Sequence, residues 1–195
     1  KELKLLSQII LGLPGDTIEK HLETLRIEIN NRVNSVQLFQ AIMLIGTEMA
    51  SMETREKFEI VTKFRVIPGG VAVYQFGDEQ VPITNIEEII VGSNVMPLED
   101  YLSCRVMHLI SMFFYNNSLF EELFLALQSH GITPFEILEV IYEHDELYTP
   151  KVNEILESFK EGSMDFYDTH EEAEAFALSK EGIGQHLSEE KGYNE

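Results

Sequence analysis

The sequence has almost no cysteine, and this excludes several kinds of stabilised or metal-bound structure. Cys104 is the only cysteine among the 195 residues, so no disulfide can form within the chain. One cysteine alone cannot build a structural zinc site or hold an iron–sulfur cluster. We expect Cys104, inside a predicted helix, to be a small core residue rather than a nucleophile. This cysteine usage fits a reducing compartment and favours a cytoplasmic protein.

Positive charge and long hydrophobic runs are also scarce. Lysine and arginine together number 14 against 34 acidic residues, which gives a formal net charge of -20. Nucleic-acid backbones and anionic membrane surfaces attract basic proteins, so we expect neither as a partner. No run of about 18 apolar residues is present, and the sequence therefore predicts no transmembrane helix.

Familiar catalytic and metal-binding patterns are missing. The sequence contains no Walker A loop, G-x-G-x-x-G, G-x-S-x-G, H-E-x-x-H or EF-hand pattern. No two histidines are spaced three or four residues apart, so each is expected to be an ordinary helix or surface residue. The only local cluster of possible metal ligands is His144, Asp145 and Glu146, at a predicted helix end. The six histidines are His21, His108, His130, His144, His170 and His186.

The first residues do not have the features of a natural amino terminus. No signal peptide is recognisable, and the first residue is lysine rather than methionine. We therefore expect this chain to be a segment of a longer reading frame or a trimmed form of the protein.

The most informative stretch runs from residue 7 to residue 42. Ile9 to Leu11 form a short apolar run that ends at a Gly12-Leu-Pro-Gly15 turn. Asp16 is predicted to be the N-cap of a helix over residues 18–32, with Glu19 as its capping-box partner. A second strand is predicted from Ser35 to Ile42. Strand, turn, helix and strand form one βαβ unit, so the two strands should be parallel neighbours.

Ligands of parallel α/β folds bind beyond the carboxyl ends of the strands. Here those ends are Gly12–Gly15 and residues 41–47, where glycine would let a flat ligand approach the backbone closely. Gln37 and Gln40 are expected near this rim. The alternative is that these are only tight turns. A phosphate site on the amides of residues 13–17 is a further alternative, although the Asp16 carboxylate would occupy the anion position.

The rest of the chain is predicted to be an extended segment and then helices. Residues 58–76 are rich in β-branched and aromatic residues around Pro68-Gly-Gly70, which predicts short strands or a small hairpin. From residue 83 onward we expect helices. Their predicted starts are Thr84 or Asn85 for residues 86–91, Pro97 for residues 98–115, a Ser118–Glu121 capping box, Thr133-Pro134, Thr149-Pro150 and Thr169 with Glu172. Beyond Gly182 the short polar sequence is expected to be loose.

The segments Ile9-Ile-Leu-Gly-Leu-Pro-Gly-Asp-Thr17, Val36-Gln-Leu-Phe-Gln40 and Gly46-Thr-Glu48 resemble the late strands of the radical S-adenosylmethionine barrel. Further stretches, Thr54–Lys57, Phe64–Val66 and residues 94–109, resemble members that carry a cobalamin-binding domain upstream. The chain departs from the family pattern at Ile45, where proline is usual before Gly46. It also lacks the CxxxCxxC loop that holds the [4Fe–4S] cluster, which in the family lies upstream of these strands.

The resemblance implies a fold, cofactors and a site. The fold would be α/β: late βα units of a partial parallel (β/α) barrel over residues 1–60, a connecting extended segment over 61–82, a helical extension over 83–182 and a loose acidic tail over 183–195. The full-length enzyme would use S-adenosylmethionine, a [4Fe–4S] cluster held by an upstream half and, in some members, cobalamin. It would act on a small-molecule substrate through a 5′-deoxyadenosyl radical. The family's adenine contacts fall on Ile10, Leu11, Gly12, Phe39 and Gln40.

A different class of function remains open on the sequence alone. The long helical run after residue 83 also fits a non-catalytic, acidic helical module that binds other proteins. The two hypotheses differ in whether the strands near Gly12 form part of a larger barrel.

Overall fold

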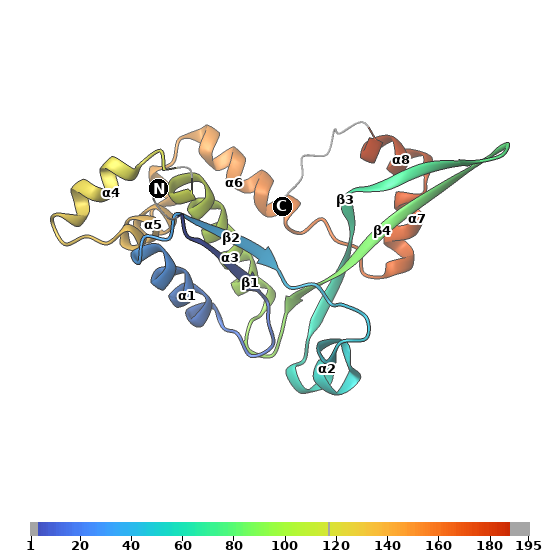
Figure 1. Ribbon diagram of the computed structural model, residues 1–195, viewed down its shortest axis with the longest axis horizontal. Helices are drawn as coiled ribbons and strands as arrows, with labels where there is room; N and C mark the ends of the chain where they lie inside the picture. The colour runs from blue at the N-terminus through green and yellow to red at the C-terminus, as the bar shows by residue number, and fades with distance from the viewer. Residues whose placement is uncertain (1–3, 117, 188–195) are drawn as a thin grey trace.

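The structure is a computed structural model that describes residues 4–116 and 118–187, and it is a mixed α/β protein (Figure 1). In chain order the first half contains β1 (Leu6–Leu11), α1 (Ile18–Asn30), β2 (Ser35–Gln40), the short 3₁₀ helix η1 (Glu48–Ala50), α2 (Met52–Phe58), β3 (Val61–Phe76) and β4 (Glu79–Gly92). The second half contains α3 (Leu98–Ser111), the short π-helix η2 (Met112–Asn116), α4 (Glu121–Gln128), α5 (Pro134–Glu143), the 3₁₀ helix η3 (Asp145–Leu147), α6 (Pro150–Gly162), α7 (His170–Ala177) and α8 (Lys180–Leu187).

The predicted βαβ unit is confirmed. β1 and β2 are parallel, and their register runs from Leu6 opposite Ser35 to Leu11 opposite Gln40. Helix α1 connects them, and its buried Leu25 and Ile29 pack against the sheet. Its N-cap is Thr17, whose hydroxyl accepts a hydrogen bond from the Lys20 amide, so the prediction of Asp16 as the cap was wrong.

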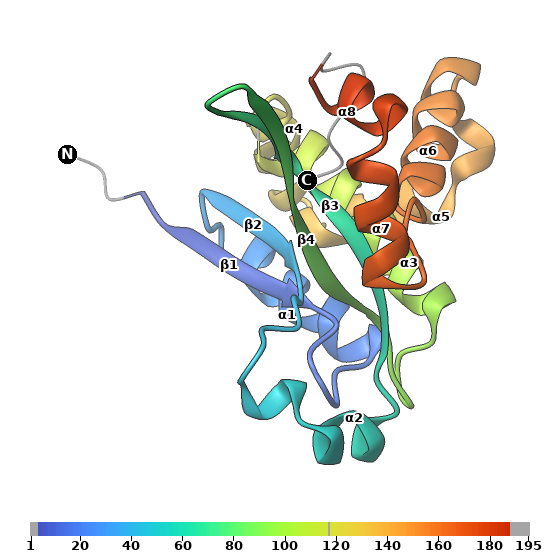
Figure 2. The same cartoon turned by 90° about the vertical axis from the view of Figure 1, so that its right-hand side faces the viewer.

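Helices cover only one face of this parallel pair. The core there joins Ile9 and Val36 of the strands to residues of α1, α3, α4 and α5. The side chains that alternate with them on β1 and β2 are exposed, including Leu6, Ile10 and Phe39. Figure 2 shows the two strands at the edge of the molecule, with α1 and α3 to one side.

Residues 58–76, predicted as short strands or a small hairpin around Pro68-Gly-Gly70, instead contain one long strand, β3, which turns at residues 77–78 and pairs antiparallel with β4. β4 continues to Gly92, so a boundary at residue 83 and a helix over residues 86–91, capped by Thr84 or Asn85, were wrong. The physical reason is that Ile89, Ile90 and Val91 are β-branched and fully buried between layers, which suits a strand. The hairpin projects away from the parallel pair and packs against α7 and α8 (Figures 1 and 2).

Four of the six helix starts predicted after residue 83 are confirmed, including Pro97, which is the N-cap of α3, and two are not. Thr133 and Thr169 form capping boxes with Glu136 and Glu172, and Thr149 caps α6. Ser118 does not cap α4, because its φ is +52° and the N-cap position falls on Phe120. The tail expected to be loose after Gly182 continues as helix α8 to Leu187, and its remainder, residues 188–195, lies outside the described residues.

Within the described ranges, no helix combines the length and the apolar character that crossing a bilayer requires. The described residues do not show the partial parallel barrel implied by the resemblance: their parallel sheet consists of the two strands β1 and β2.

Candidate functional site

The candidate site is the carboxyl end of β1 and β2, where the five predicted contact residues lie. Ile10 and Phe39 are directly opposite each other in the parallel register. Their side chains are 43% and 46% exposed, and both lie on the face that helices leave bare. They form an apolar surface suited to a flat ring or to a further layer of protein.

Leu11 and Gly12 face the interior. Leu11 has no exposed surface and belongs to a core with Ile89, Val91 and Tyr101. Gly12 is buried at a φ of +91°, and a Cβ there would lie 3.1 Å from the Ile90 carbonyl oxygen. The bare glycine rim expected from the sequence is therefore occupied by β4, and Gly12 lets the two backbones approach closely.

Backbone hydrogen bonds hold β4 across the turn that follows β1. The chain after β2 turns toward the hairpin, where the Ile90 amide donates to the Ala41 carbonyl at 2.9 Å and the Met43 amide donates to the Glu88 carbonyl at 2.7 Å. The Ala41 amide in turn donates to the Leu11 carbonyl at 2.8 Å. These bonds satisfy the backbone groups at the strand ends and fix β4 against the turn after β1.

Gln40 and Gln37, the two glutamines expected near the rim, have protein partners. The Gln40 side-chain oxygen accepts a 2.8 Å hydrogen bond from Arg65 of β3, and Arg65 also pairs with Glu87 at 3.0 Å. Gln37 accepts a 2.8 Å hydrogen bond from Gln8 across the bare face. Gln40 therefore places a half-buried guanidinium beside the end of β2.

Beneath the turn lies a buried chain of titratable groups that sequence reasoning missed. His21 of α1 places Nδ1 3.1 Å from the Asp16 carboxylate and Nε2 2.7 Å from Nε2 of His108 on α3. Both imidazoles are almost fully buried. The residues are 87 positions apart, so no local spacing could have indicated the pair.

The protonation of this pair follows from its geometry. Burial lowers the pKa of His21, although Asp16 opposes that shift, and burial holds the pKa of His108 well below its usual range. Both rings are therefore neutral. Since His21 Nδ1–H donates to Asp16, its Nε2 is an acceptor, and His108 Nε2–H donates to it. His108 Nδ1 is then a bare acceptor, which agrees with its lack of a partner.

Neither cysteine nor carboxylate chemistry provides a metal centre in the described part of the chain. Burial raises the pKa of the Cys104 thiol to about 12, so this residue remains a neutral core thiol, as predicted. Among residues 4–116 and 118–187, no three histidine, cysteine, aspartate or glutamate side chains gather closely enough to hold a metal ion. His144 instead pairs with Glu146 at 2.8 Å on the surface.

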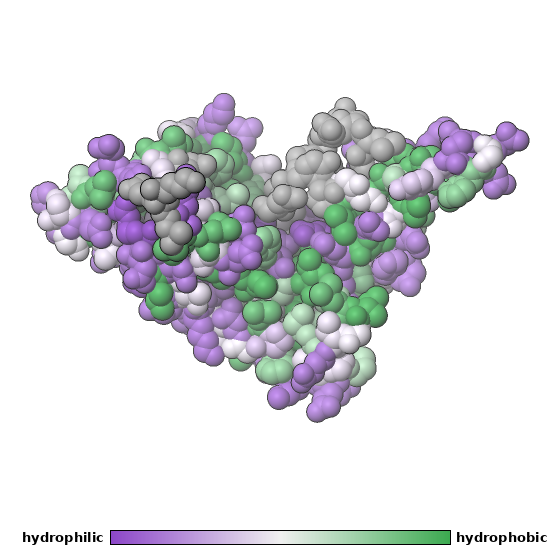
Figure 3. All heavy atoms as spheres, in the orientation of Figure 1, coloured by the Kyte–Doolittle hydropathy of each residue, from purple (hydrophilic) through white to green (hydrophobic). Residues whose placement is uncertain are grey.

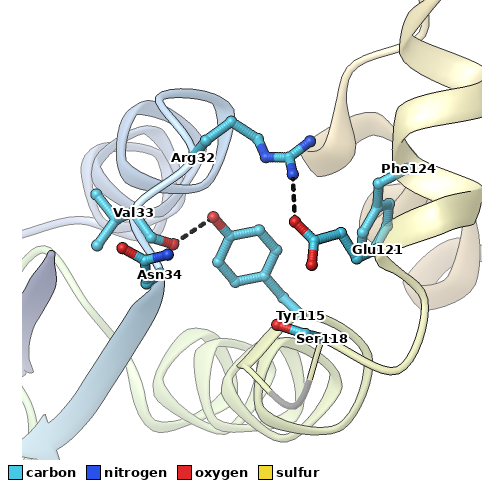
Figure 4. A pocket seen from close by; sticks show the side chains of 7 residues that line it. All are labelled: Arg32, Val33, Asn34, Tyr115, Ser118, Glu121 and Phe124. Atoms are coloured by element: carbon cyan, nitrogen blue, oxygen red, sulfur yellow. Dashed lines mark hydrogen bonds and ion pairs between the residues drawn. The ribbon is translucent and has the colours of Figure 1, made fainter. Parts of the chain in front are cut away.

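A small cavity of about 70 Å³ lies at the opposite end of the parallel pair (Figure 4). The Tyr115 hydroxyl donates to the Val33 carbonyl beside it, and Arg32 closes it through a 3.0 Å ion pair with Glu121. Its size and its paired lining suit ordered water rather than a substrate. We interpret it as part of the packing between β2, η2 and α4.

Comparisons with known proteins give no further constraint. No family model matches this sequence, and no curated protein matches it either.

Proposed function

We propose that this chain is the late part of a (β/α) barrel in a radical S-adenosylmethionine enzyme. The observation that carries the proposal is the bare face of the β1–β2 pair, with exposed Leu6, Ile10 and Phe39. Parallel strands are almost always covered on both faces and joined to further strands. A two-stranded parallel sheet with one uncovered apolar face is what the end of an incomplete barrel would look like.

The sequence resemblance gives this barrel its chemical class. The Gly-Leu-Pro-Gly turn follows β1, and the paired strand Val36–Gln40 follows the crossover helix, in the order of the family's late strands. In the proposed enzyme, Ile10 and Phe39 would form the apolar wall beside adenine. Leu11 and Gly12 would support that wall from behind, because their side of the backbone is covered by the core and by β4.

The residues of this chain do not fit the iron–sulfur cluster itself. Such a cluster needs three cysteine thiolates, whereas the single Cys104 is buried with a raised pKa. In the proposal, the cluster ligands belong to an upstream half of the protein, which would also supply the strands that cover the bare face. No residue described here is assigned to cobalamin.

A second candidate, an acidic protein-interaction module, has an observation in its favour. The β3–β4 hairpin extends beyond the helices, and its outer part exposes large apolar side chains at Tyr74, Phe76 and Ile83. Figure 3 shows hydrophobic surface below the centre of the view as well, near the end of β2 and the start of the hairpin. These surfaces fit protein partners without requiring chemistry.

Formation of 5′-deoxyadenosine distinguishes the two candidates. The full-length protein, reconstituted anaerobically with iron, sulfide and a reductant, should convert S-adenosylmethionine to 5′-deoxyadenosine. Replacing Phe39 with aspartate should reduce the yield by about tenfold or more, because a charge replaces the adenine wall. Leu119→Asp, at a 76% exposed site on the loop before α4, is the matched control and should leave the yield unchanged. A full-length protein without a CxxxCxxC loop, or one that forms no 5′-deoxyadenosine, would exclude the enzyme.

A further inference from the structure

Arg105 of α3 is a buried cation without a counter-charge. Its side chain is 3% exposed, and neither Nε nor Nη2 has a hydrogen-bond partner. Its guanidinium lies over the ring of Phe159 on α6, with Cζ 5.2 Å from the ring centroid. A ring face attracts the charge but accepts no N–H hydrogen bond in the guanidinium plane, so two strong donors remain unsatisfied.

Two further buried hydroxyls without partners belong to the same pair of helices. Tyr101 precedes Arg105 by one turn on α3, and its hydroxyl is buried and unpaired. Ser163 follows Phe159 by one turn at the end of α6, where its amide donates to the Phe159 carbonyl at 2.8 Å, and its hydroxyl is also unpaired. Buried polar groups nearly always have hydrogen-bond partners, so three side chains with unpaired polar atoms on two packed helices need an explanation.

The charges around Arg105 indicate that a partner for it would be an anion. Burial lowers the pKa of Arg105 and raises the pKa of Tyr101 to about 12, and the nearby Arg65 guanidinium lowers both. Arg65 is already paired with Glu87, and no carboxylate of the described ranges forms an ion pair with Arg105. Arginine remains charged in proteins, so burying it unpaired destabilises the folded state. In a chain with an excess of acidic residues, the Arg105 guanidinium is thus buried without a carboxylate partner, and its Nε and Nη2 donors suit the oxygens of an anion.

We propose that Arg105 anchors an oxyanion site between α3 and α6 that takes a carboxylate or phosphate group. Nε and Nη2 form one edge of the guanidinium, and this edge binds two oxygens of such a group through parallel N–H donors. The Tyr101 hydroxyl supplies a third donor from the preceding turn. This site does not depend on the enzyme class proposed above.

Electrostatics indicates the side from which the anion enters. A groove of about 700 Å³ runs along the outer contact of α3 and α6. Its lining carries Glu143, Asp145, Glu157 and Glu161 against one cation, Lys160, which pairs with Glu157, so it repels anions. On the other side, Arg65 lies close enough to lower the pKa of Arg105, and it hydrogen-bonds Gln40 at the carboxyl end of β2, where ligands of parallel sheets bind. Because both nitrogens are closed off in this structure, entry requires α6 and Phe159 to move away from α3.

Thermal unfolding in different anions tests the site. At constant ionic strength, replacing chloride with inorganic phosphate or with acetate should raise the melting temperature of the purified protein saturably. Phosphate alone would indicate a phosphorylated ligand, and acetate alone a carboxylate. Arg105→Met should abolish the response and should melt no lower than the wild type in chloride, because the unpaired charge is gone. Arg32→Met, which removes an exposed ion pair with Glu121, is the control and should keep the response.

Tyr101→Phe keeps the experiment decisive if Arg105→Met does not fold. This variant removes only an unpaired hydroxyl, so its melting temperature in chloride should be unchanged. Its anion affinity should fall by about tenfold, the usual effect of losing one hydrogen bond to a charged group. The proposal is overturned if neither oxyanion stabilises the wild type, or if Arg105→Met or Tyr101→Phe responds as strongly as the wild type does.

Discussion

At the scale of single residues, two different contacts hold the turn after β1 in place. Gly12 allows the Ile90 carbonyl to pass where a Cβ would otherwise lie, and Asp16 accepts a hydrogen bond from the buried His21. Through His108 that contact reaches α3, so a carboxylate, two neutral imidazoles and a glycine together position the end of β1. Each of the two contacts can be tested separately.

Gly12→Ala should destabilise the protein by about 1–3 kcal/mol, because alanine is strained at a φ of +91° and its Cβ would press on backbone. Gly46→Ala is the matched control: its φ is +83°, but no atom lies within 4 Å of the added Cβ. Urea unfolding should therefore show a larger loss for Gly12→Ala than for Gly46→Ala. Equal losses would mean that the contact with Ile90 adds nothing.

The histidine pair predicts a loss of stability in acid. Burial lowers the folded-state pKa values of His21 and His108, so the unfolded chain binds more protons once the pH falls below the unfolded value of about 6.5. Each histidine then lowers the free energy of unfolding by about 1.4 kcal/mol for each pH unit of acidification. Its contribution to stability is fully present only above a pH of about 6.5. Urea unfolding at several pH values should show a shallower acid loss in His108→Gln than in the wild type.

His144→Gln is the control for this titration. Its hydrogen bond to Glu146 raises the pKa of the exposed His144, which has the opposite linkage sign, so removing it should leave the acid loss as large or slightly larger. If His108→Gln and the wild type lose stability in parallel between pH 7.5 and 5.5, the pair is not held neutral.

At the scale of elements, an ion pair attaches helix α2 to the hairpin, together with a 2.9 Å hydrogen bond from the Asn94 amide to the Phe58 carbonyl. Arg55 donates two hydrogen bonds, of 2.6 and 2.8 Å, to the two carboxylate oxygens of Glu88, and Thr62 donates a third. α2 has no fully buried residue. A bidentate pair with little apolar packing around it should therefore determine how often this helix opens.

Glu88→Gln should increase hydrogen exchange of the α2 amides by about tenfold, because a neutral amide cannot accept both guanidinium bonds. Exchange in α1 and α5 should stay unchanged. Glu53→Gln, on the exposed side of α2, is the control and should exchange like the wild type. Uniform acceleration across the whole molecule would instead indicate global destabilisation.

The elements that sequence reasoning found are those specified by nearby residues. The parallel unit follows from an apolar run, a glycine turn and a crossover helix, and the helix starts at Thr133, Thr149 and Thr169 follow from capping within three residues. β4 was missed because Ile86, Ile89 and Ile90 have the i, i+3, i+4 spacing of one helix face, with Glu87 and Glu88 between them. Its pairing with β3 and its crossing over Gly12 favour the strand, and neither is local.

The same limit applies to the candidate site. The register of β1 with β2 placed Ile10 beside Phe39, as a βαβ unit requires. The His21–His108 pair and the burial of Arg105 depend on how α3 packs against α1 and α6. Residues so far apart along the chain show no pattern before the helices are in place.

At the scale of the whole molecule, an acidic surface surrounds one uncovered apolar sheet face. The net charge of -20 opposes association, whereas Leu6, Ile10 and Phe39 favour it once salt screens the charge. The chain alone should therefore self-associate more strongly as ionic strength rises. Phe39→Ser should reduce this association in sedimentation velocity, and Leu119→Ser should not. If both variants associate like the wild type, contact occurs through another surface.

Thiol labelling of Phe39→Cys is the most direct test of the claim that other strands of a larger barrel cover this face. Cys104 is buried with a raised pKa, so the engineered thiol would be the only reactive one in this chain. We expect fast labelling in this chain alone, and strong protection in the full-length protein that increases further with S-adenosylmethionine. Leu119→Cys should label equally fast in both. Equal, fast labelling of Phe39→Cys in the chain and in the full-length protein would contradict the barrel.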